Sequence, residues 1–443
     1  ILASMGGNMS LGSDVANGPY SQSSTSSLFW QNKSWQICQE EIDIYTTWWE
    51  ACQGPNQDPQ ACANGQVPTN ASLTRIYDWP AHGDISLGEP YWLAPFFDYN
   101  NDGMYSPNDG DYPIIKGGCA TWRIENDETP FAHEISGTDA LGIEMQHMTY
   151  QYRNYGLLND VTFVEVIAIN RSNQTYYDFS YGIHTDMFVG DATDDYVGSD
   201  SLKNLYYVYN SSDTDALLGV DPGVIGIVAL QDSLSSVINF DTQNNINDTW
   251  DLMNGNYPGT VDILDAQGNP TSFLYHDNPN ISGGYSQEAQ TTGFTSPQAF
   301  IASKRNTYAP GDTLRQTFAF VYVNEGSRLQ SVDAMYQAAD ELQIFFDTIA
   351  NAQCEDGVLS TSTMDESIGV QLLPNPASNY VDVVVNASGA FVVSLLDMTG
   401  KIIASEKGES MVSLNLSDLA NGAYVVHIQS GTSIFTEKLL VDH

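Results

Sequence analysis

The sequence predicts a mostly β protein: an antiparallel β-sandwich body with a few helices and calcium-type loops, and a small C-terminal β-sandwich domain. Three observations lead to this fold class. Short runs of alternating β-branched and aromatic residues recur along the chain, and clusters of Gly, Asn, Asp and Ser separate them. A polar stretch without periodicity then divides a long first part from a short β-rich last part.

Four runs define the clearest strands of the body. They lie at residues 162–169, 205–209, 223–228 and 317–323. Their alternation is typical of half-buried strands, and the turn-forming residues between them favour antiparallel sandwiches. Two other segments, 37–50 and 329–349, repeat apolar residues at three- and four-residue steps, which predicts helices. Ser331 is the expected N-cap of the second helix.

The domain organisation follows from these patterns. We expect a body over residues 1–351, a linker over 352–366 and a C-terminal domain over 367–443. A break near 155–160 would divide the body into two subdomains. The last domain should hold strands near 380–386, 390–397, 401–405, 411–416, 423–429 and 433–441.

The charge balance excludes several kinds of partner. The chain has 443 residues, 14 Lys plus Arg and 55 Asp plus Glu, for a net charge of −41. Too few cations are present to neutralise nucleic-acid phosphates or to dock on anionic lipid. The 42% hydrophobic content predicts a packed core rather than an acidic tail. A compact body so charged repels itself unless cations offset part of the charge.

The cysteines and the lack of an apolar membrane-spanning segment indicate the compartment. No run of eighteen apolar residues occurs, so we expect no membrane insertion. Because the chain begins at Ile1, we expect a removed leader or a fragment. Cys52 and Cys62 flank a short loop and would pair in an oxidising compartment. Cys38 and Cys119 are the candidate second pair, and five unpaired thiols are the alternative.

The strongest chemical motif is an acidic loop at residues 98–111. Oxygen side chains stand at loop positions 1, 3 and 5, Gly at 6, a carbonyl donor at 7 and a carboxylate at 12, as a Ca²⁺ loop requires. The candidate ligands are Asp98, Asn100, Asp102, Met104 and Asp109, with Asp111 as an alternative closing residue. Prolines before, inside and after the loop rule out long flanking helices. A solvated turn rich in Asn and Asp is the alternative interpretation.

A second acidic cluster spans residues 184–200. Its carboxylates would repel one another unless they bind a cation or point apart. The candidate metal ligands are Asp186, Asp191, Asp194, Asp195 and Asp200. His184 could join them, although a lone His is more often a structural hydrogen-bonding group. Asp213, Asp215 and Asp221 form a weaker third group.

No catalytic motif is present. The sequence contains no HExxH, GxSxG, P-loop or GxGxxG pattern, so we expect a protein that is not an enzyme. A pair of carboxylates for glycoside hydrolysis would be defined by spacing in three dimensions, which the sequence does not give.

The last part of the chain resembles a known family. The matching segments are Leu372–Ala377, Leu396–Lys401, Leu419–Val426 and Glu437–Val441. In this order they are similar to the type A C-terminal sorting domain of the Bacteroidota type IX secretion system. The resemblance implies export across the outer membrane by that machinery and a location outside the cell or on its surface. It also implies that the domain is normally removed.

The body resembles uncharacterised surface proteins that carry such domains. The matching stretches are Trp79–Asp84, Leu93–Pro113, Ile169–Ser172 and Asp194–Gly198. Together these features predict a Ca²⁺-stabilised extracellular structural or adhesive protein, such as a filament or surface-layer subunit. Self-association or a cell-surface glycan would supply its partner. A secreted hydrolase or glycan-binding protein is the alternative.

Overall fold

The structure is a computed structural model of the whole chain. It describes residues 2–441 except 4–8, 11–13, 22, 129–132, 134–135, 153–155, 241–245, 291–296, 351–369, 374–376, 386–390, 397–401, 409–410, 418, 420–421 and 431–432. Two compact units are present, Ile1–Asp340 and Glu341–His443. The expected linker at 352–366 lies outside the described residues.

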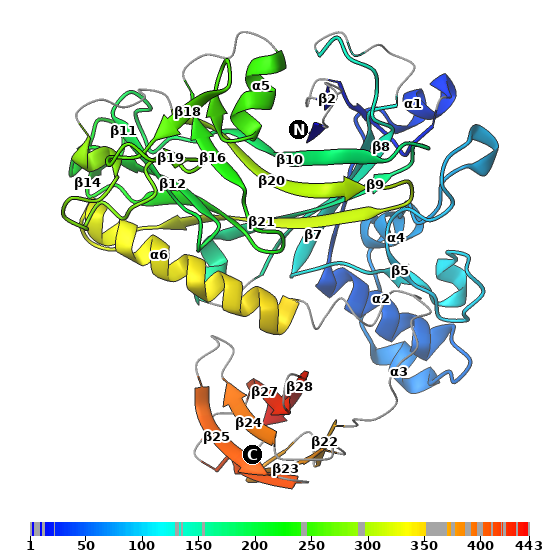
Figure 1. Cartoon of the computed structure of the whole chain (residues 1–443). Helices are drawn as coiled ribbons and strands as arrows, with labels where there is room; N and C mark the ends of the chain where they lie inside the picture. Colours follow the sequence, from blue (N-terminus) through cyan, green and yellow to red (C-terminus); the bar gives the residue numbers. More distant parts are fainter. Residues whose placement is uncertain are drawn as a thin grey trace. The chain divides into compact units, whose positions relative to one another are not determined.

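The first unit is a sandwich of two antiparallel sheets, as the alternating runs predict (Figure 1). The smaller sheet has five strands, in the order β16 (Ser236–Asn239), β20 (Gln298–Tyr308), β10 (Tyr176–Asp186), β1 (Leu2–Ala3) and β2 (Met9–Ser10). The larger sheet has nine strands: β11 (Asp195–Asp200), β12 (Leu205–Asn210), β15 (Val224–Ala229), β21 (Thr313–Val323), β9 (Val161–Asn170), β8 (Ile143–Gln151), β7 (Cys119–Asn126) and β3 (Ala16–Asn17), with β4 (Trp35–Cys38) paired to β7.

The main core lies between the two sheets. Tyr206, Val208 and Ile227 from the larger sheet pack in one cluster with Val237 and Phe300 from the smaller one. All five side chains are almost fully buried. Inward-facing residues that alternate with outward-facing ones supply this core, so the period of two in the sequence is the physical cause of the sandwich.

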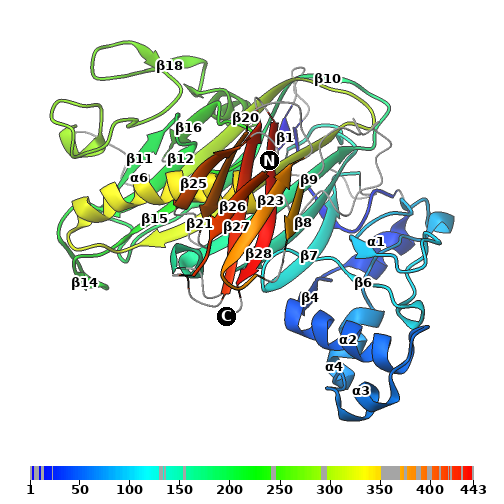
Figure 2. The ribbon, with the colours of Figure 1, turned by 90° about the horizontal axis from the view of Figure 1, so that it is seen from below.

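Helix α6 (Arg328–Phe345) covers the outer face of the larger sheet near β12 and β15 (Figures 1 and 2). Its Tyr336 ring lies 5.7 Å from the Tyr207 ring. Gly226 permits this approach, because a Cβ there would lie 2.7 Å from the Met335 sulfur. The helix begins at Arg328, so Ser331 is not its N-cap as expected. Ser331 lies in the first turn, where its hydroxyl accepts the Glu325 N–H.

The expected break near 155–160 does not divide the body. Residues 156–160 form the short 3₁₀ turn η3 (Gly156–Asp160), which directly precedes β9. The two strands pair antiparallel from Ile143↔Asn170 to Tyr150↔Phe163. A turn between paired neighbours belongs inside one sheet, and the sandwich is therefore continuous across it.

Smaller elements lie on the periphery of the sandwich. The helices are α1 (Ser24–Trp30), α2 (Gln39–Cys52), α3 (Pro59–Asn64), α4 (Asn70–Tyr77) and α5 (Ile246–Met253), with a π-helical turn η5 (Phe346–Ala350) after α6. Short strand pairs are β5 (Phe96–Phe97) with β6 (Tyr112–Pro113) and β13 (Thr214–Asp215) with β14 (Gly219–Val220); β17 (Asn256–Tyr257), β18 (Val261–Leu264) and β19 (Pro270–Thr271) form a small sheet. No described helix is long and apolar enough to cross a membrane.

The second unit contains two further antiparallel sheets. One is β22 (Val370–Leu373), β23 (Tyr380–Val385) and β26 (Met411–Asn415); the other is β25 (Ile402–Gly408), β24 (Phe391–Leu396), β27 (Gly422–Ser430) and β28 (Ser433–Val441). Val383, Phe391, Leu395 and Ile428 belong to their common core. The six expected strands are present, and β22 is an additional one.

Candidate functional site

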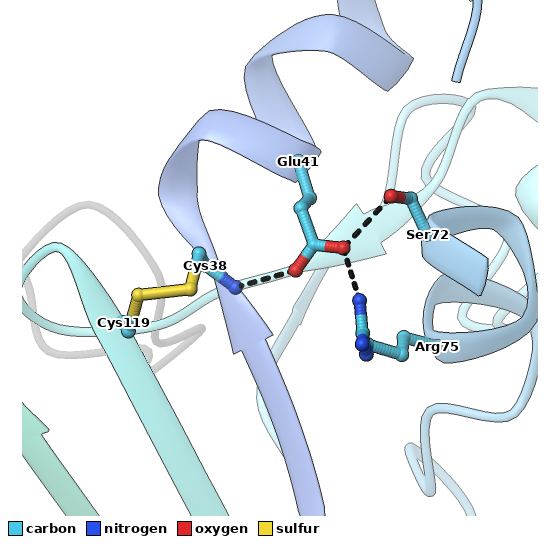
Figure 3. Close-up of a disulfide and its surroundings, with 5 residues drawn as sticks. All are labelled: Cys38, Glu41, Ser72, Arg75 and Cys119. Atoms are coloured by element: carbon cyan, nitrogen blue, oxygen red, sulfur yellow. Dashed lines mark hydrogen bonds and ion pairs between the residues drawn. A yellow bond between two sulfur atoms is a disulfide. The ribbon is translucent and has the colours of Figure 1, made fainter. Parts of the chain in front are cut away.

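The candidate site is the acidic loop at residues 98–111, and a disulfide-linked group of helices supports it. Cys38 at the end of β4 is bonded to Cys119 at the start of β7, and the two residues are direct register partners (Figure 3). A second disulfide joins Cys52 at the end of α2 to Cys62 in α3, over a separation of 10 residues. Both cysteine pairs expected from the sequence are therefore joined.

Glu41 fixes the start of α2 and connects it to α4. One carboxylate oxygen accepts the Cys38 backbone N–H at 3.2 Å, and the other accepts the Ser72 hydroxyl at 2.7 Å and an N–H of Arg75 (Figure 3). Burial of this carboxyl acts to raise its pKa. The hydrogen bonds from Ser72 and Cys38 and the Arg75 charge outweigh burial and hold the pKa of Glu41 below its ordinary value.

Helix α2 presents two aromatic side chains to the acidic loop. The Tyr45 hydroxyl donates to the Pro107 carbonyl, and the Trp49 indole N–H donates to the Asn108 carbonyl at 3.1 Å. The Trp49 ring also meets Tyr99 edge-on at 4.8 Å between centroids. These contacts set the position of the loop relative to the disulfide-linked helices.

The first half of the loop folds around its own oxygen side chains. Asp98 accepts the Gly103 N–H at 2.7 Å and the Asp102 N–H at 3.2 Å. Asn100 accepts the Asp102 N–H at 3.1 Å, and Asp102 accepts the Met104 N–H at 2.8 Å. Gly103 has φ +75°, the left-handed conformation expected of a Gly at loop position 6.

Asp111, rather than Asp109, makes hydrogen bonds across the loop. Its side chain is fully buried, and it accepts the Tyr99 N–H at 2.9 Å and the Ser106 N–H at 2.7 Å. Burial raises the pKa of Asp111, and the nearby Asp98 and Asp102 charges raise it further. Asp109 is exposed at the end of the short turn η2 (Pro107–Asp109). The β5–β6 pair brackets the loop where an EF-hand would have helices.

The second acidic cluster is only partly brought together. Asp191, Asp194 and Asp195 lie beside Asp215, whose carboxylate accepts the Asp191 N–H at 2.8 Å. Asp200 ends β11, five residues after Asp195 begins it. At about 3.3 Å per residue it is too distant to share an ion with Asp195.

The remaining members of this cluster have other surroundings. Asp186 is exposed at the end of β10, in the other sheet. The His184 ring packs on Phe300 at 5.1 Å, and burial lowers its pKa, so it is a structural aromatic contact here. The sequence places Asp215 in a separate group, because its distance along the chain from Asp191 and Asp195 gives no sign that they are neighbours. The β13–β14 hairpin brings Asp215 next to them.

Asp195 is electrostatically strained. It is 5% exposed, one of its oxygens accepts the Val189 N–H at 2.7 Å, and its Oδ1 has no hydrogen-bond partner. Burial, followed by the charges of Asp194, Asp215 and Asp191, raises the pKa of Asp195 to about 7. Among the described residues, no three His, Cys, Asp or Glu side chains are grouped so as to hold a metal ion.

Three solved structures to which the chain is similar are all remote neighbours. A polysaccharide lyase is 9% identical, with TM-score 0.22, over 80% of this chain and 37% of its own. The dimeric latent PorU from Porphyromonas gingivalis is 12% identical, with TM-score 0.15, over 73% and 31%. A β-glucuronidase from Faecalibacterium prausnitzii is 11% identical, with TM-score 0.16, over 61% and 47%. The chain spans less than half of each, and at these TM-scores none supports an inference about fold or activity.

The C-terminal unit gives the informative comparison. No curated protein matches the chain. Residues 371–442 match the model of the secretion system C-terminal sorting domain. The matched residues include nearly all the described strands of the second unit. This tail marks proteins handled by the type IX secretion machinery. The protein is therefore a type IX secretion substrate, exported to the cell surface or the extracellular space.

Proposed function

We propose that the protein is a Ca²⁺-stabilised adhesive protein of the cell exterior, in which the loop at 98–111 binds the ion. The observation that carries the proposal is the order of oxygen donors around Gly103. Asp98, Asn100 and Asp102 precede this glycine, and Asp111 lies buried beneath the loop. Ca²⁺ prefers such sets of carboxylate, amide and carbonyl oxygens from one short loop.

The chemistry of the donor set fits Ca²⁺ better than a transition metal. Carboxylates alone do not form a complete group here, so the ion would also use the Asn100 amide oxygen and the Met104 carbonyl. All of these are hard oxygen donors, and no His or Cys takes part in the loop. When bound, the ion would offset the mutual repulsion of Asp98, Asp102 and Asp111 and hold the loop against α2.

An adhesive role is favoured over self-assembly by the charge of the chain. Copies that each carry −41 repel one another, which opposes filament or layer formation. The sorting domain supports delivery to the outer surface, where binding to a non-identical partner is not opposed in this way.

Thermal unfolding tests the Ca²⁺ part of the proposal. At about 2 mM Ca²⁺, near the range of weak extracellular sites, we expect the melting temperature to rise by about 5 °C over its value in EDTA. The double variant Asp98→Asn/Asp102→Asn should lose this shift. Asp265→Asn is the matched control, because Asp265 also caps a turn by accepting the Gln267 and Asn269 N–H groups. An unchanged wild-type melting temperature would refute Ca²⁺ binding.

Retention on immobilised polysaccharides, with product analysis, tests the adhesive part. We expect retention without release of new reducing ends or unsaturated products. Catalytic release of new reducing ends would indicate a hydrolase, and release of unsaturated products a lyase; either result would contradict the adhesive role.

A further inference from the structure

The acidic loop lies beside an exposed tryptophan that the fold does not bury. Trp92 is 55% exposed, and its neighbour Tyr91 is 37% exposed. The indole N–H groups of Trp30, Trp49 and Trp79 donate to Glu89, Asn108 and Pro95 respectively, which makes them structural anchors. The large exposed surface of Trp92 contributes little to the core. Exposed aromatic side chains of this kind are enriched at binding sites.

Neighbouring rings hold Trp92 and Tyr91 in fixed orientations. Trp92 stacks on Phe96 at 5.9 Å with 18° between the planes, and meets the His82 ring edge-on at 5.2 Å. Tyr91 stacks on His82 at 4.1 Å, meets Trp92 edge-on at 5.1 Å and donates its hydroxyl to the Gly103 carbonyl at 3.2 Å. A ligand would therefore meet a preformed surface and would not bear the entropic cost of ordering these rings.

His82 is the centre of this arrangement. Its Nε2 accepts the Tyr105 N–H at 2.9 Å, so its Nδ1 carries the proton and donates to the Tyr91 carbonyl at 3.2 Å. Both ring nitrogens are thus used by the backbone on either side. The exposed surfaces of the Trp92 and Tyr91 rings remain accessible to a ligand.

The polar groups around the rings accept hydrogen bonds and carry negative charge. Asn100 and Asp102 are exposed on the loop that Trp92 touches, where a Cβ at Gly103 would lie 3.5 Å from the indole. No Lys or Arg occurs between Arg75 and Lys116. The site therefore disfavours anionic ligands and also disfavours a second copy of this acidic chain.

We infer that the exposed rings of Trp92 and Tyr91, next to the acceptor groups of the acidic loop, form a binding site for a neutral sugar residue of a polysaccharide. A pyranose ring has an apolar C–H face that packs on an aromatic ring, and hydroxyl donors that match carboxylate and amide acceptors. This inference rests on the proposed adhesive function and names its ligand class. It does not require the loop to bind Ca²⁺.

Affinity electrophoresis and calorimetry with the full chain test the site. The neutral probes are laminarin, xylan, galactomannan and dextran; polygalacturonate is the anionic probe and chitosan the cationic one. We expect binding of at least one neutral probe, weakened at least tenfold by Trp92→Ala and largely kept by Trp92→Phe. Tyr177→Ala is the control, because Tyr177 is an aromatic residue of similar exposure, 57%, on strand β10 of the sandwich.

The outcomes separate this inference from the Ca²⁺ proposal. No binding of any neutral probe, binding of only a charged probe, or unchanged binding by Trp92→Ala would each overturn the sugar site. Melting curves establish that each variant is folded, and a Trp92→Ala variant with a wild-type melting temperature makes a loss of binding local. Trp92-dependent binding without a Ca²⁺ shift in melting temperature would leave the sugar site standing and refute only the ion.

Discussion

Replacing Gly110 by Ala should destabilise the first unit through one identifiable clash. Gly110 has φ +103°, and a Cβ there would lie 2.7–2.9 Å from three ring carbons of Trp49. The backbone conformation costs an L-residue about 1–2 kcal/mol. Displacing the Trp49 ring, which donates to Asn108 and packs on Tyr99, adds about 1–3 kcal/mol of overpacking. We therefore expect a total loss of about 2–5 kcal/mol in unfolding free energy.

Urea unfolding followed by tryptophan fluorescence measures this loss. All eight tryptophans lie within Ile1–Asp340, so the signal reports the first unit without the sorting domain. Gly268→Ala is the matched control. Gly268 has φ +81° and no atom within 4 Å of a Cβ, so only the backbone cost should appear.

The reasoning is refuted if Gly110→Ala and Gly268→Ala destabilise the unit equally. The change Trp49→Leu provides a further check. It should be less harmful in a Gly110→Ala background than alone, because it removes the clashing ring.

Three further predictions concern the same unit. The double variant Cys52→Ser/Cys62→Ser, which opens a loop of 10 residues, should lower stability by about 3 kcal/mol in urea unfolding. Burial lowers the pKa of His82 below its ordinary 6.5. The neutral imidazole therefore contributes its full stabilisation above pH 6.5, and this contribution is lost as the pH falls below 6.5. In EDTA, the variant His82→Gln should show a weaker dependence of unfolding free energy on pH in this range. The pKa of Asp195 is raised from 3.8 to about 7, so the unfolding free energy falls as the pH rises from 3.8 towards 7. The variant Asp195→Asn should therefore raise the unfolding free energy by about 2 kcal/mol near pH 8 and by less near pH 5. Equal effects of this last variant at both pH values would contradict the assigned ionisation.

The strands of the sandwich were predictable because each carries its own pattern. The run at 162–169 became β9, Val161–Asn170, since alternation alone determines which side chains enter the core. Helix α2 was also predicted, but the start of α6 was not. Ser331 has the chemistry of an N-cap, yet its hydroxyl bonds to Glu325 from inside the helix, a contact set by the chain preceding the helix.

The candidate site was predictable to the extent that it is local. Asp98, Asn100 and Asp102 are adjacent in sequence and converge around Gly103 through short-range hydrogen bonds. The closing residue was not determined, because burial of Asp111 against Tyr99 and Ser106 depends on packing. The exposure of the Trp92 side chain could not be predicted from the sequence either, since an indole in a β-rich chain is usually buried.

The bond between Cys38 and Cys119 has a consequence for the route across the outer membrane. It closes a covalent ring over a separation of 81 residues, and such bonds form in the oxidising periplasm. A ring cannot be threaded as a single extended strand. If oxidation precedes passage, the translocation channel must be wide enough for at least two chain segments side by side. Comparing export of the wild type with that of Cys38→Ser/Cys119→Ser would show whether crosslinked cargo is accepted.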